Sequence, residues 1–387
     1  MAECCSKSSE CGTGCGSQGI GVYADVKDYY GKQLKKTSDL KSNACVSPAK
    51  PTPAFIRKAL KEVHSEVTSR YYGCGLVVPE CLEGCRVLDL GSGSGQDCYV
   101  LSQLVGEEGH ITGLDMTEEQ LEVAEKYIDY HMKKFGYMHP NVDFVKGYIE
   151  ALQDAGLKEN TYDVIISNCV INLSPNKSAV LREAYRVLKD GGELYFSDVY
   201  SNKRLPEEVR THKVLWGECL GGALWWKDLL LLAEEVGFGT PRLVTAHYIT
   251  IGNKELESLI GDCKFVSATY RLFKIPKSCP RERRQVIYNG AITGFEKMLE
   301  FDVNCTFQEG QVAEVDGEIA AILKGSRFAE EFSFQPVVKT QPASTGCCPA
   351  VSQTIVTDPF EIADLLEHGN TRLPTGGCCG AKALDCQ

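Results

Sequence analysis

The chain has 387 residues, a formal net charge of −11 and 24% charged residues. This length exceeds one compact core, so we expect two domains with flexible ends. The acidic balance and the lack of a basic run make nucleic acid and anionic membranes poor partners, and no stretch is apolar for long enough to span a bilayer. The start of the chain lacks the apolar core of a signal peptide, so we predict a cytosolic protein.

The chain contains 19 cysteines, an odd number that fits a reducing compartment better than a disulfide scaffold. The first of them lie among Ser and Gly in residues 1–20, a composition that cannot build a core, so we expect a mobile segment there. Because free cysteine is a common small buried hydrophobe, we expect several others to be inert: Cys81, Cys85, Cys98, Cys263, Cys279 and Cys305.

Residues 21–75 are predicted to form a helical cap over the sheet that follows. Three prolines interrupt a loop, and a helix then begins near Phe55, with apolar residues at helical spacing through Val67.

A glycine-rich turn then follows the apolar run of residues 86–90, and it has the form G-x-G-x-G over residues 91–95. A dinucleotide fingerprint requires glycine at the sixth position, where this chain has Gln96. Asp89 precedes the turn and can hold the amino group of a zwitterion, while Asp115 ends the next strand and can accept both ribose hydroxyl protons. Together these features predict a site for S-adenosylmethionine.

The rest of this region alternates strands and helices. Thr117 and Gln120 have the spacing of a helix capping box, and apolar strands are predicted at residues 142–146, 162–168 and 193–198. A helix from Lys177 to Leu188 is expected to end at the glycines that follow. This order predicts an α/β protein with a doubly wound, Rossmann-like class I methyltransferase sheet over residues 76–250.

The pattern changes beyond residue 250. Residues 265–272 and 285–288 alternate as antiparallel strands do, which predicts a smaller α+β domain over residues 251–335. Residues 336–387 combine cysteines with Gly and Pro and are expected to be a mobile tail.

Three cysteines lie where they can reach one cleft. Cys169 follows the predicted strand 162–168, at the edge of an α/β sheet where ligands bind, and Cys74 and Cys219 lie in glycine-containing segments. Three thiols from separate segments would form a soft pocket for a thiophilic centre.

With these residues the chain resembles the animal-type arsenite methyltransferases, from about Val22 to Pro336 and again at residues 377–380. Segments 70–76, 167–173 and 215–222 are specific to that family, while 88–95 and 192–200 are common to many methyltransferases. The resemblance implies that methyl groups pass from S-adenosylmethionine to trivalent arsenic, giving mono- and dimethylated arsenicals in arsenic detoxification.

The resemblance also implies roles for single residues. Cys74, Cys169 and Cys219 match the arsenic-binding thiolates, and Cys45 matches a redox-active cysteine that can be a transient ligand. The positions that match the donor site are Tyr72, Gly91, Ser92, Gly93, Asp115, Met116, Thr117, Gln120, Ile149, Glu150 and Asn168.

Trivalent arsenic keeps a lone pair when three thiolates bind it, so it can attack the sulfonium methyl group without a general base. The thiols must lose their protons, so arsenite binding is expected to tighten as the pH rises. Electrons must be returned to arsenic, and we expect a thiol reductant, glutathione or thioredoxin, to supply them through Cys45. The substrates are then arsenite and methylarsenite as thiol conjugates, and a monomer is expected.

Two other functions stay open at this point. The protein could methylate an organic thiol, amine or hydroxyl group, with Cys169 an ordinary core residue. It could also be a non-catalytic thiol-based binder of a metalloid or zinc, although the three cysteines lack the C-x-x-C spacing of a structural zinc site.

Overall fold

The computed structural model describes residues 16–30, 52–73, 77–337 and 356–368. Cys45, Cys74 and the terminal cysteines lie outside these described residues, so the predictions made for them stay predictions. Of residues 16–20 only the backbone is described.

Eight strands form one mixed sheet in the order β3-β2-β1-β4-β5-β8-β7, and β6 pairs with β5 beside that path. The strands from β3 to β5 are parallel, whereas β8 is antiparallel to both β5 and β7. Their bounds are β1 Arg86–Leu90, β2 His110–Asp115, β3 Val142–Lys146, β4 Tyr162–Asn168, β5 Leu188–Ser201, β6 Leu224–Trp225, β7 Arg242–Tyr248 and β8 Phe265–Phe273.

Helices cover both faces of the sheet, so the central strands are buried and consist of nearly continuous apolar runs. The core on one face includes α7, α10 and α13, and the core on the other includes α2, α3, α4 and α6. The helix bounds are α1 Gly16–Asp28, α2 Ala54–Glu62, α3 Ser65–Ser69, α4 Gln96–Val105, α5 Glu118–Lys126, α6 Ile128–Phe135, α7 Lys177–Val187, α8 Glu207–Arg210, α9 Lys213–Gly217, α10 Trp226–Val236, α11 Lys254–Ile260, α12 Gly317–Gly325 and α13 Pro359–Glu367.

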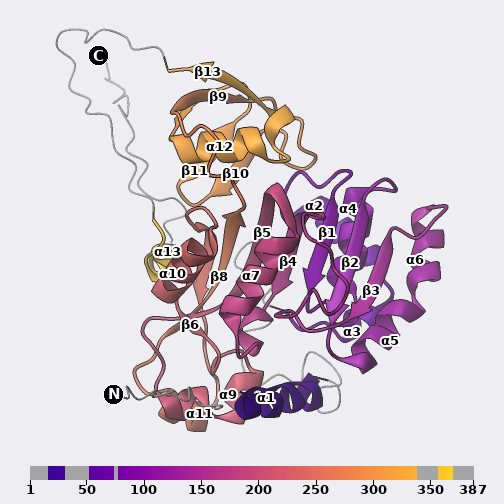
Figure 1. The fold of residues 1–387 in the computed structure, drawn as a ribbon, viewed down its shortest axis with the longest axis vertical. Coiled ribbons are helices and arrows are strands. Elements are labelled where there is room, and N and C mark those ends of the chain that lie inside the picture. Colours follow the sequence, from indigo (N-terminus) through magenta and orange to yellow (C-terminus); the bar gives the residue numbers. More distant parts are fainter. Residues whose placement is uncertain (1–15, 31–51, 74–76, 338–355, 369–387) are drawn as a thin grey trace, which may run out of the picture.

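A smaller domain lies at one end of the sheet, and α1, α9 and α11 lie at the other end (Figure 1). In the small domain β9 pairs with β12 and β13, and β10 pairs with β11, all antiparallel. Its strands are β9 Arg284–Tyr288, β10 Met298–Asp302, β11 Cys305–Gln308, β12 Val312–Val315 and β13 Phe332–Pro336. They share an aromatic-rich core with α12. The predicted fold class, a Rossmann-like sheet with a smaller C-terminal domain, is confirmed.

Two placements differ from the sequence-based expectation. Residues 265–273 are antiparallel as expected, but they pair with β5 and so belong to the main sheet, not to the small domain. Within the expected tail, α13 packs against β7 and buries Ile362 and Ala363 in the main core. Both differences have the same cause, because contacts with distant segments outweigh local composition.

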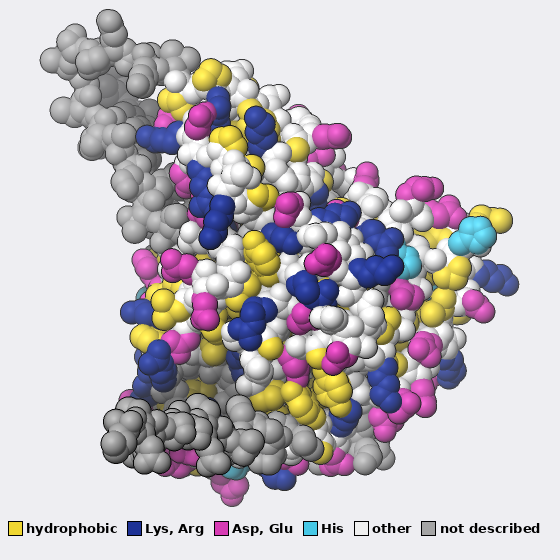
Figure 2. Space-filling model, viewed as in Figure 1, with side chains coloured by type: hydrophobic (Ala, Val, Ile, Leu, Met, Phe, Trp, Pro, Cys, Tyr) yellow, Lys and Arg dark blue, Asp and Glu magenta, His cyan; other side chains and the backbone are white. Residues whose placement is uncertain are grey.

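No helix in the described parts of the chain is long and apolar enough to cross a membrane. On the face drawn in Figure 2, lysine and arginine side chains are interspersed with aspartate and glutamate among uncharged and hydrophobic surface.

Candidate functional site

A cavity of about 950 Å³, counting its open mouth, lies at the carboxyl ends of β1, β2 and β4. This is the edge at which open α/β sheets bind their ligands. Every donor-site residue named from the sequence lines it: Tyr72, Asp89, Gly91, Ser92, Gly93, Asp115, Met116, Thr117, Gln120, Ile149, Glu150 and Asn168. Cys169 lines it as well, so one cavity joins the predicted donor site to a predicted arsenic ligand.

The glycine turn needs its glycines for two reasons. Gly91 and Gly93 have φ angles of 77° and 52°, in the left-handed region that other residues avoid. A Cβ atom at Gly91 would also lie 2.4 Å from Val170. The turn can therefore approach a ligand closely, and it packs directly on the residue that follows Cys169.

Asp115 organises the loop on the other side of the cavity. Its carboxylate accepts hydrogen bonds from the backbone N–H groups of Gly93, at 2.9 Å, and Thr117, at 2.7 Å. The Thr117 side chain makes no capping bond to α5, so the capping box expected from the sequence is not formed. Burial raises the pKa of Asp115, and the backbone N–H groups of Thr117 and Gly93 oppose that effect.

A pair of buried carboxyl groups forms the floor of the cavity. Burial raises the pKa of Asp89, and the nearby Asp97 raises it further. Burial also raises the pKa of Asp97 to about 6, against the opposing hydrogen bond from Asn168 Nδ2, at 3.1 Å. Asp97 was not predicted from the sequence, although an acidic residue in the first turn of a helix after a glycine loop is a usable signal.

Several buried polar atoms on the cavity wall have no hydrogen-bond partner within the described ranges: Ser92 Oγ, Asp97 Oδ1 and Gln120 Oε1. Buried polar atoms normally find a partner, so these favour a polar ligand. Carboxylates suit an ammonium or sulfonium group, and the amide and hydroxyl oxygens suit ribose or adenine donors. The residues present therefore fit S-adenosylmethionine.

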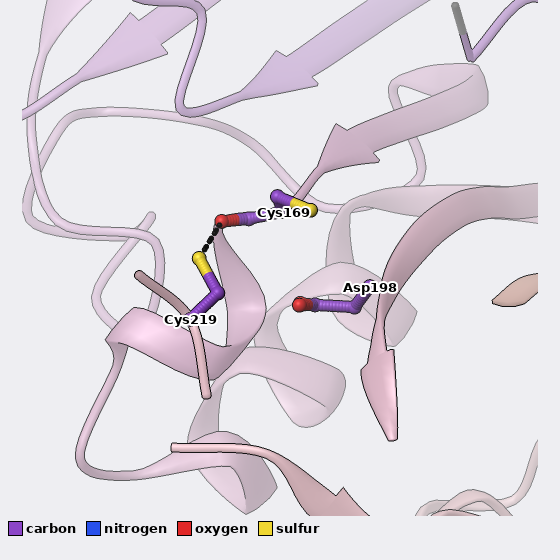
Figure 3. Close-up of side chains that lie close together, drawn as sticks. All are labelled: Cys169, Asp198 and Cys219. Carbon is purple, nitrogen blue, oxygen red and sulfur yellow. Dashed lines mark hydrogen bonds between the residues drawn. The ribbon is translucent and has the colours of Figure 1, made fainter. Parts of the chain in front are cut away.

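Next to this cavity three buried side chains from different elements meet: Cys169 after β4, Asp198 in β5 and Cys219 after α9 (Figure 3). Their sulfur and carboxylate oxygen atoms lie within 4.8 Å of one another. The Cys219 thiol donates a hydrogen bond to the backbone oxygen of Cys169, at 3.0 Å. Cys169 is disulfide-bonded.

Both cysteines have an unusual backbone. Their φ angles are 57° for Cys169 and 62° for Cys219, and in the described part of the chain only Cys81 and Asn160 share this among non-glycine residues. Such conformations cost about 1–3 kcal/mol and persist where the surrounding structure enforces them, often at functional sites. The sequence gives no signal for this strain.

Asp198 and Lys177 are charged groups near these cysteines, and neither was predicted from the sequence. Burial raises the pKa of Asp198 to about 7, although it accepts hydrogen bonds from the N–H groups of Val199 and Asn172. Burial lowers the pKa of Lys177 to about 8, with Asp198 and Cys219 opposing the change. Cys169 and Cys219 thus have a buried carboxyl group and a half-buried lysine nearby.

None of the cysteines that were expected to be inert belongs to the group formed by Cys169, Asp198 and Cys219. Burial raises the pKa of Cys81 to about 12, and it raises the pKa values of Cys85, Cys98, Cys263 and Cys305 as well. Protonated thiols are poor nucleophiles and poor ligands, which supports that expectation.

Two family models match the chain: a methyltransferase domain over residues 82–237 and an arsenite methyltransferase C-terminal domain over residues 281–386. An arsenite methyltransferase of Homo sapiens is 61% identical over 364 residues, which cover 93% of this chain and 97% of that protein. One from Aquipseudomonas alcaligenes is 51% identical, over 81% of this chain and 90% of its own length.

The chain belongs to the arsenite methyltransferase family. A crystal structure of an arsenic(III) S-adenosylmethionine methyltransferase from Chlamydomonas reinhardtii also matches, with a TM-score of 0.71 and 45% identity. The match covers 74% of this chain and 98% of that one. Membership of the arsenite methyltransferases confirms the family and the enzyme class expected from the sequence, while the roles of single residues stay predictions.

Proposed function

We propose that this protein transfers methyl groups from S-adenosylmethionine to trivalent arsenic held by Cys74, Cys169 and Cys219, giving mono- and dimethylated arsenicals. One observation supports it most: Cys169 lines the predicted donor cavity and also lies in a buried cluster with Cys219. A thiophilic acceptor bound there would face the donor directly. The same arrangement disfavours an ordinary core role for Cys169.

The bound donor would supply a methyl group on positively charged sulfur. The chain's own residues would recognise it through charge and shape: Asp89 and Asp97 form an anionic floor, Asp115 offers carboxylate oxygens, and the glycine turn permits close approach. Asn168, fixed by its hydrogen bond to Asp97, would keep the cavity wall beside Cys169 in place.

The acceptor half needs thiolates, not a general base, because arsenic bound by sulfur keeps its lone pair. On binding, Cys219 would give up the proton that it donates to the Cys169 oxygen. Cys169 would first have to be released from its disulfide, which supports the need for a thiol reductant. Asp198 adds a carboxylate oxygen to the cluster, beyond the thiols named from the sequence.

The remaining parts of the proposal concern partners. We propose that Cys45 takes part in the thiol-disulfide step, with glutathione or thioredoxin as the electron source, and that arsenite and methylarsenite arrive as thiol conjugates. A monomer in the cytosol would suit this chemistry, since that compartment keeps thiols reduced. If Cys45→Ser leaves repeated turnover intact, the role of Cys45 is wrong.

The experiment that tests the function incubates the purified, reduced chain with S-adenosylmethionine, arsenite and glutathione and separates the arsenic species by chromatography. Cys169→Ser and Cys219→Ser are compared with Cys279→Ser, a free, half-buried cysteine of the small domain. We expect methylated arsenic from the wild type and from Cys279→Ser. The two site variants should lose more than the roughly 10–100-fold that loss of an outer partner costs a metal site.

Other outcomes would select the alternatives. Donor binding without arsenic methylation, together with methylation of an organic thiol, amine or hydroxyl compound, would favour an organic acceptor. Tight arsenite or zinc binding with no methyl transfer to any acceptor would favour a binding protein.

A further inference from the structure

Helix α1 lies against both halves of the proposed site. Tyr23 and Val26 on α1, and Tyr30 just after it, line the donor cavity. On its other side α1 packs against α9, which leads directly into Cys219, and Figure 1 shows the two helices next to each other at one end of the molecule.

Two consecutive tyrosines connect the end of α1 to the residues before Cys219. The Tyr29 hydroxyl donates to Oε1 of Glu218, at 2.6 Å, and the Tyr30 hydroxyl donates to the backbone oxygen of Gly217, at 2.8 Å. Glu218 is fully buried. Gly217 packs so closely on the Tyr29 ring that a Cβ atom would lie 3.1 Å from it. The turn that carries Cys219 is therefore held from α1 by two hydrogen bonds and a ring contact.

The same segment is also bound to the donor side. Gln120, which lines the donor cavity, donates from Nε2 to the backbone oxygen of Tyr30, at 3.2 Å. The ring of Tyr30 meets that of Tyr72 edge-on, with centroids 5.7 Å apart. Tyr23 donates a hydrogen bond to Glu150 across the cavity. Residues 23–30 thus connect donor-site side chains with the Cys219 turn.

Cys219 needs such support because its φ angle of 62° is unfavourable for a residue with a Cβ atom. A strained backbone keeps its conformation only when neighbouring contacts enforce it. The hydrogen bonds of Tyr29 and Tyr30 act on the two residues immediately before this position. Without them the turn could relax and move the Cys219 sulfur away from Cys169 and Asp198.

We propose that Tyr29 and Tyr30 are positioning residues that hold Cys219 in the geometry for binding arsenic. Both belong to the segment that lines the donor cavity. Binding of the donor therefore helps to hold Cys219 in position through them, and donor and arsenic favour each other's binding. This inference rests on the proposed function, since it assumes that Cys219 is an arsenic ligand. Neither tyrosine touches the reacting atoms.

The test uses the full, reduced chain as wild type, Tyr29→Phe, Tyr30→Phe and Tyr137→Phe. Tyr137 is the matched control, a partly buried tyrosine that donates one hydrogen bond to a backbone oxygen, that of Ser102, away from α1 and the Cys219 turn. Calorimetry measures arsenite affinity with and without saturating S-adenosylhomocysteine, and the affinity for S-adenosylhomocysteine alone. KM and kcat for arsenite are measured in parallel.

We expect Tyr29→Phe to weaken arsenite binding by up to about 10- to 150-fold, the effect of losing one hydrogen bond to a carboxylate, and Tyr30→Phe by less. KM for arsenite should rise while kcat at saturating arsenite stays near that of the wild type. Saturating S-adenosylhomocysteine should tighten arsenite binding to the wild type and to Tyr137→Phe but much less to Tyr29→Phe. Affinity for S-adenosylhomocysteine alone should change little in Tyr29→Phe and Tyr137→Phe, whose tyrosines do not line the donor cavity.

Arsenite affinity of Tyr29→Phe equal to that of the wild type would overturn the inference. So would an equal loss of both affinities, because that would indicate general loosening of α1. If Tyr29→Phe does not fold, Tyr30→Phe decides, since it leaves the bond to Glu218 in place. A wild type that neither binds nor methylates arsenite would instead contradict the proposed function.

Discussion

Two groups of buried charges lie at opposite ends of the main sheet and differ in how they are compensated. At the junction with the small domain, Arg271 pairs with Glu193, at 2.5 Å, and Arg327 pairs with the other oxygen of Glu193, at 2.6 Å. Glu80 lies 3.3 Å from Arg271. Burial alone would raise the pKa of Glu193, but Arg271 and Arg327 outweigh it and hold the pKa below its usual value.

At the donor cavity the buried charges have the same sign. The charged neighbours that act on Asp89 are Asp97 and Asp115, both carboxyl groups, and together with burial they raise its pKa. The charges of the paired cluster therefore compensate one another at the junction of the two domains, while the carboxyl cluster costs stability that a cationic ligand would return. Buried charge marks structure in one place and a binding site in the other.

The largest expected effect comes from breaking the paired cluster. Arg271→Met leaves Glu193 and Glu80 with one buried cation, and removing one partner of a buried pair typically costs about 3–5 kcal/mol. We expect the free energy of unfolding, measured by urea denaturation, to fall by this amount. Arg283→Met, in an exposed pair with Glu314, is the control. A similar small loss in both variants would mean that the cluster is not structural.

Asp97→Asn, in the carboxyl cluster, should weaken donor binding without lowering stability. A charge-assisted hydrogen bond contributes about 1.5–3 kcal/mol, so we expect donor affinity to fall by roughly 10- to 150-fold. Stability without ligand should stay equal or rise, because a buried charge beside Asp89 is removed. Calorimetry with S-adenosylmethionine and a thermal melt test the two parts. Unchanged donor affinity would show that Asp97 does not recognise the donor.

The pH dependence of donor affinity should report on the carboxyl cluster. With the pKa of Asp97 at about 6, a cationic donor that requires the ionised carboxylate should bind about tenfold more tightly at pH 7 than at pH 5. Asp97→Asn should lose most of this dependence. A flat profile for the wild type would contradict an ionised Asp97 in the complex.

The same pKa shifts predict how the stability of the ligand-free protein depends on pH, and Asp97 and Glu193 act in opposite directions. The folded state binds the extra proton of Asp97 between its ordinary pKa and about 6, so this group makes the protein less stable as the pH rises through that window. Glu193, whose pKa is lowered, contributes stability that is present above its ordinary pKa and is lost as the pH falls below it. In urea denaturation from pH 4 to 7, the free energies of unfolding of Asp97→Asn and the wild type should become more alike as the pH falls.

The smallest effect is expected on the surface. Lys146 and Glu118 form an ion pair at 3.0 Å, but more than half of each side chain is exposed. Water and salt screen such pairs, and their median contribution is near zero. Lys146→Ala should leave the melting temperature unchanged within error. A clear loss would show that distance alone, without burial, decides the value of an ion pair here.

The sequence predicted the parallel half of the sheet well because buried parallel strands are continuous apolar runs. Residues 142–146 and 162–168 are strands β3 and β4 with the expected bounds. The donor residues also lie around one cavity, because a glycine turn and a strand-terminal acid meet at the same sheet edge. These signals are local, and each spans only a few residues.

The rest depended on distant contacts. Alternation in residues 265–273 indicated an antiparallel strand but could not tell that it pairs with β5. In the sequence, Asp198 and Lys177 look like ordinary residues of a strand and a helix. Only their position near Cys219 in the folded chain marks them as part of the site. Tyr29 lies 189 positions before Glu218, too far apart for any sequence pattern to connect them.

The segment of residues 356–367, which ends in helix α13, attaches the far end of the described chain to both domains. Asn304, between β10 and β11, exchanges two hydrogen bonds with the backbone of Val356, and Tyr270 of β8 donates to the backbone oxygen of Thr357. A protease cut or an early stop codon that removed everything after residue 337 would expose the apolar surface of the main sheet that Ile362 covers. Such a shortened chain would keep every residue of the donor cavity and yet be prone to aggregation and rapid degradation in the cell.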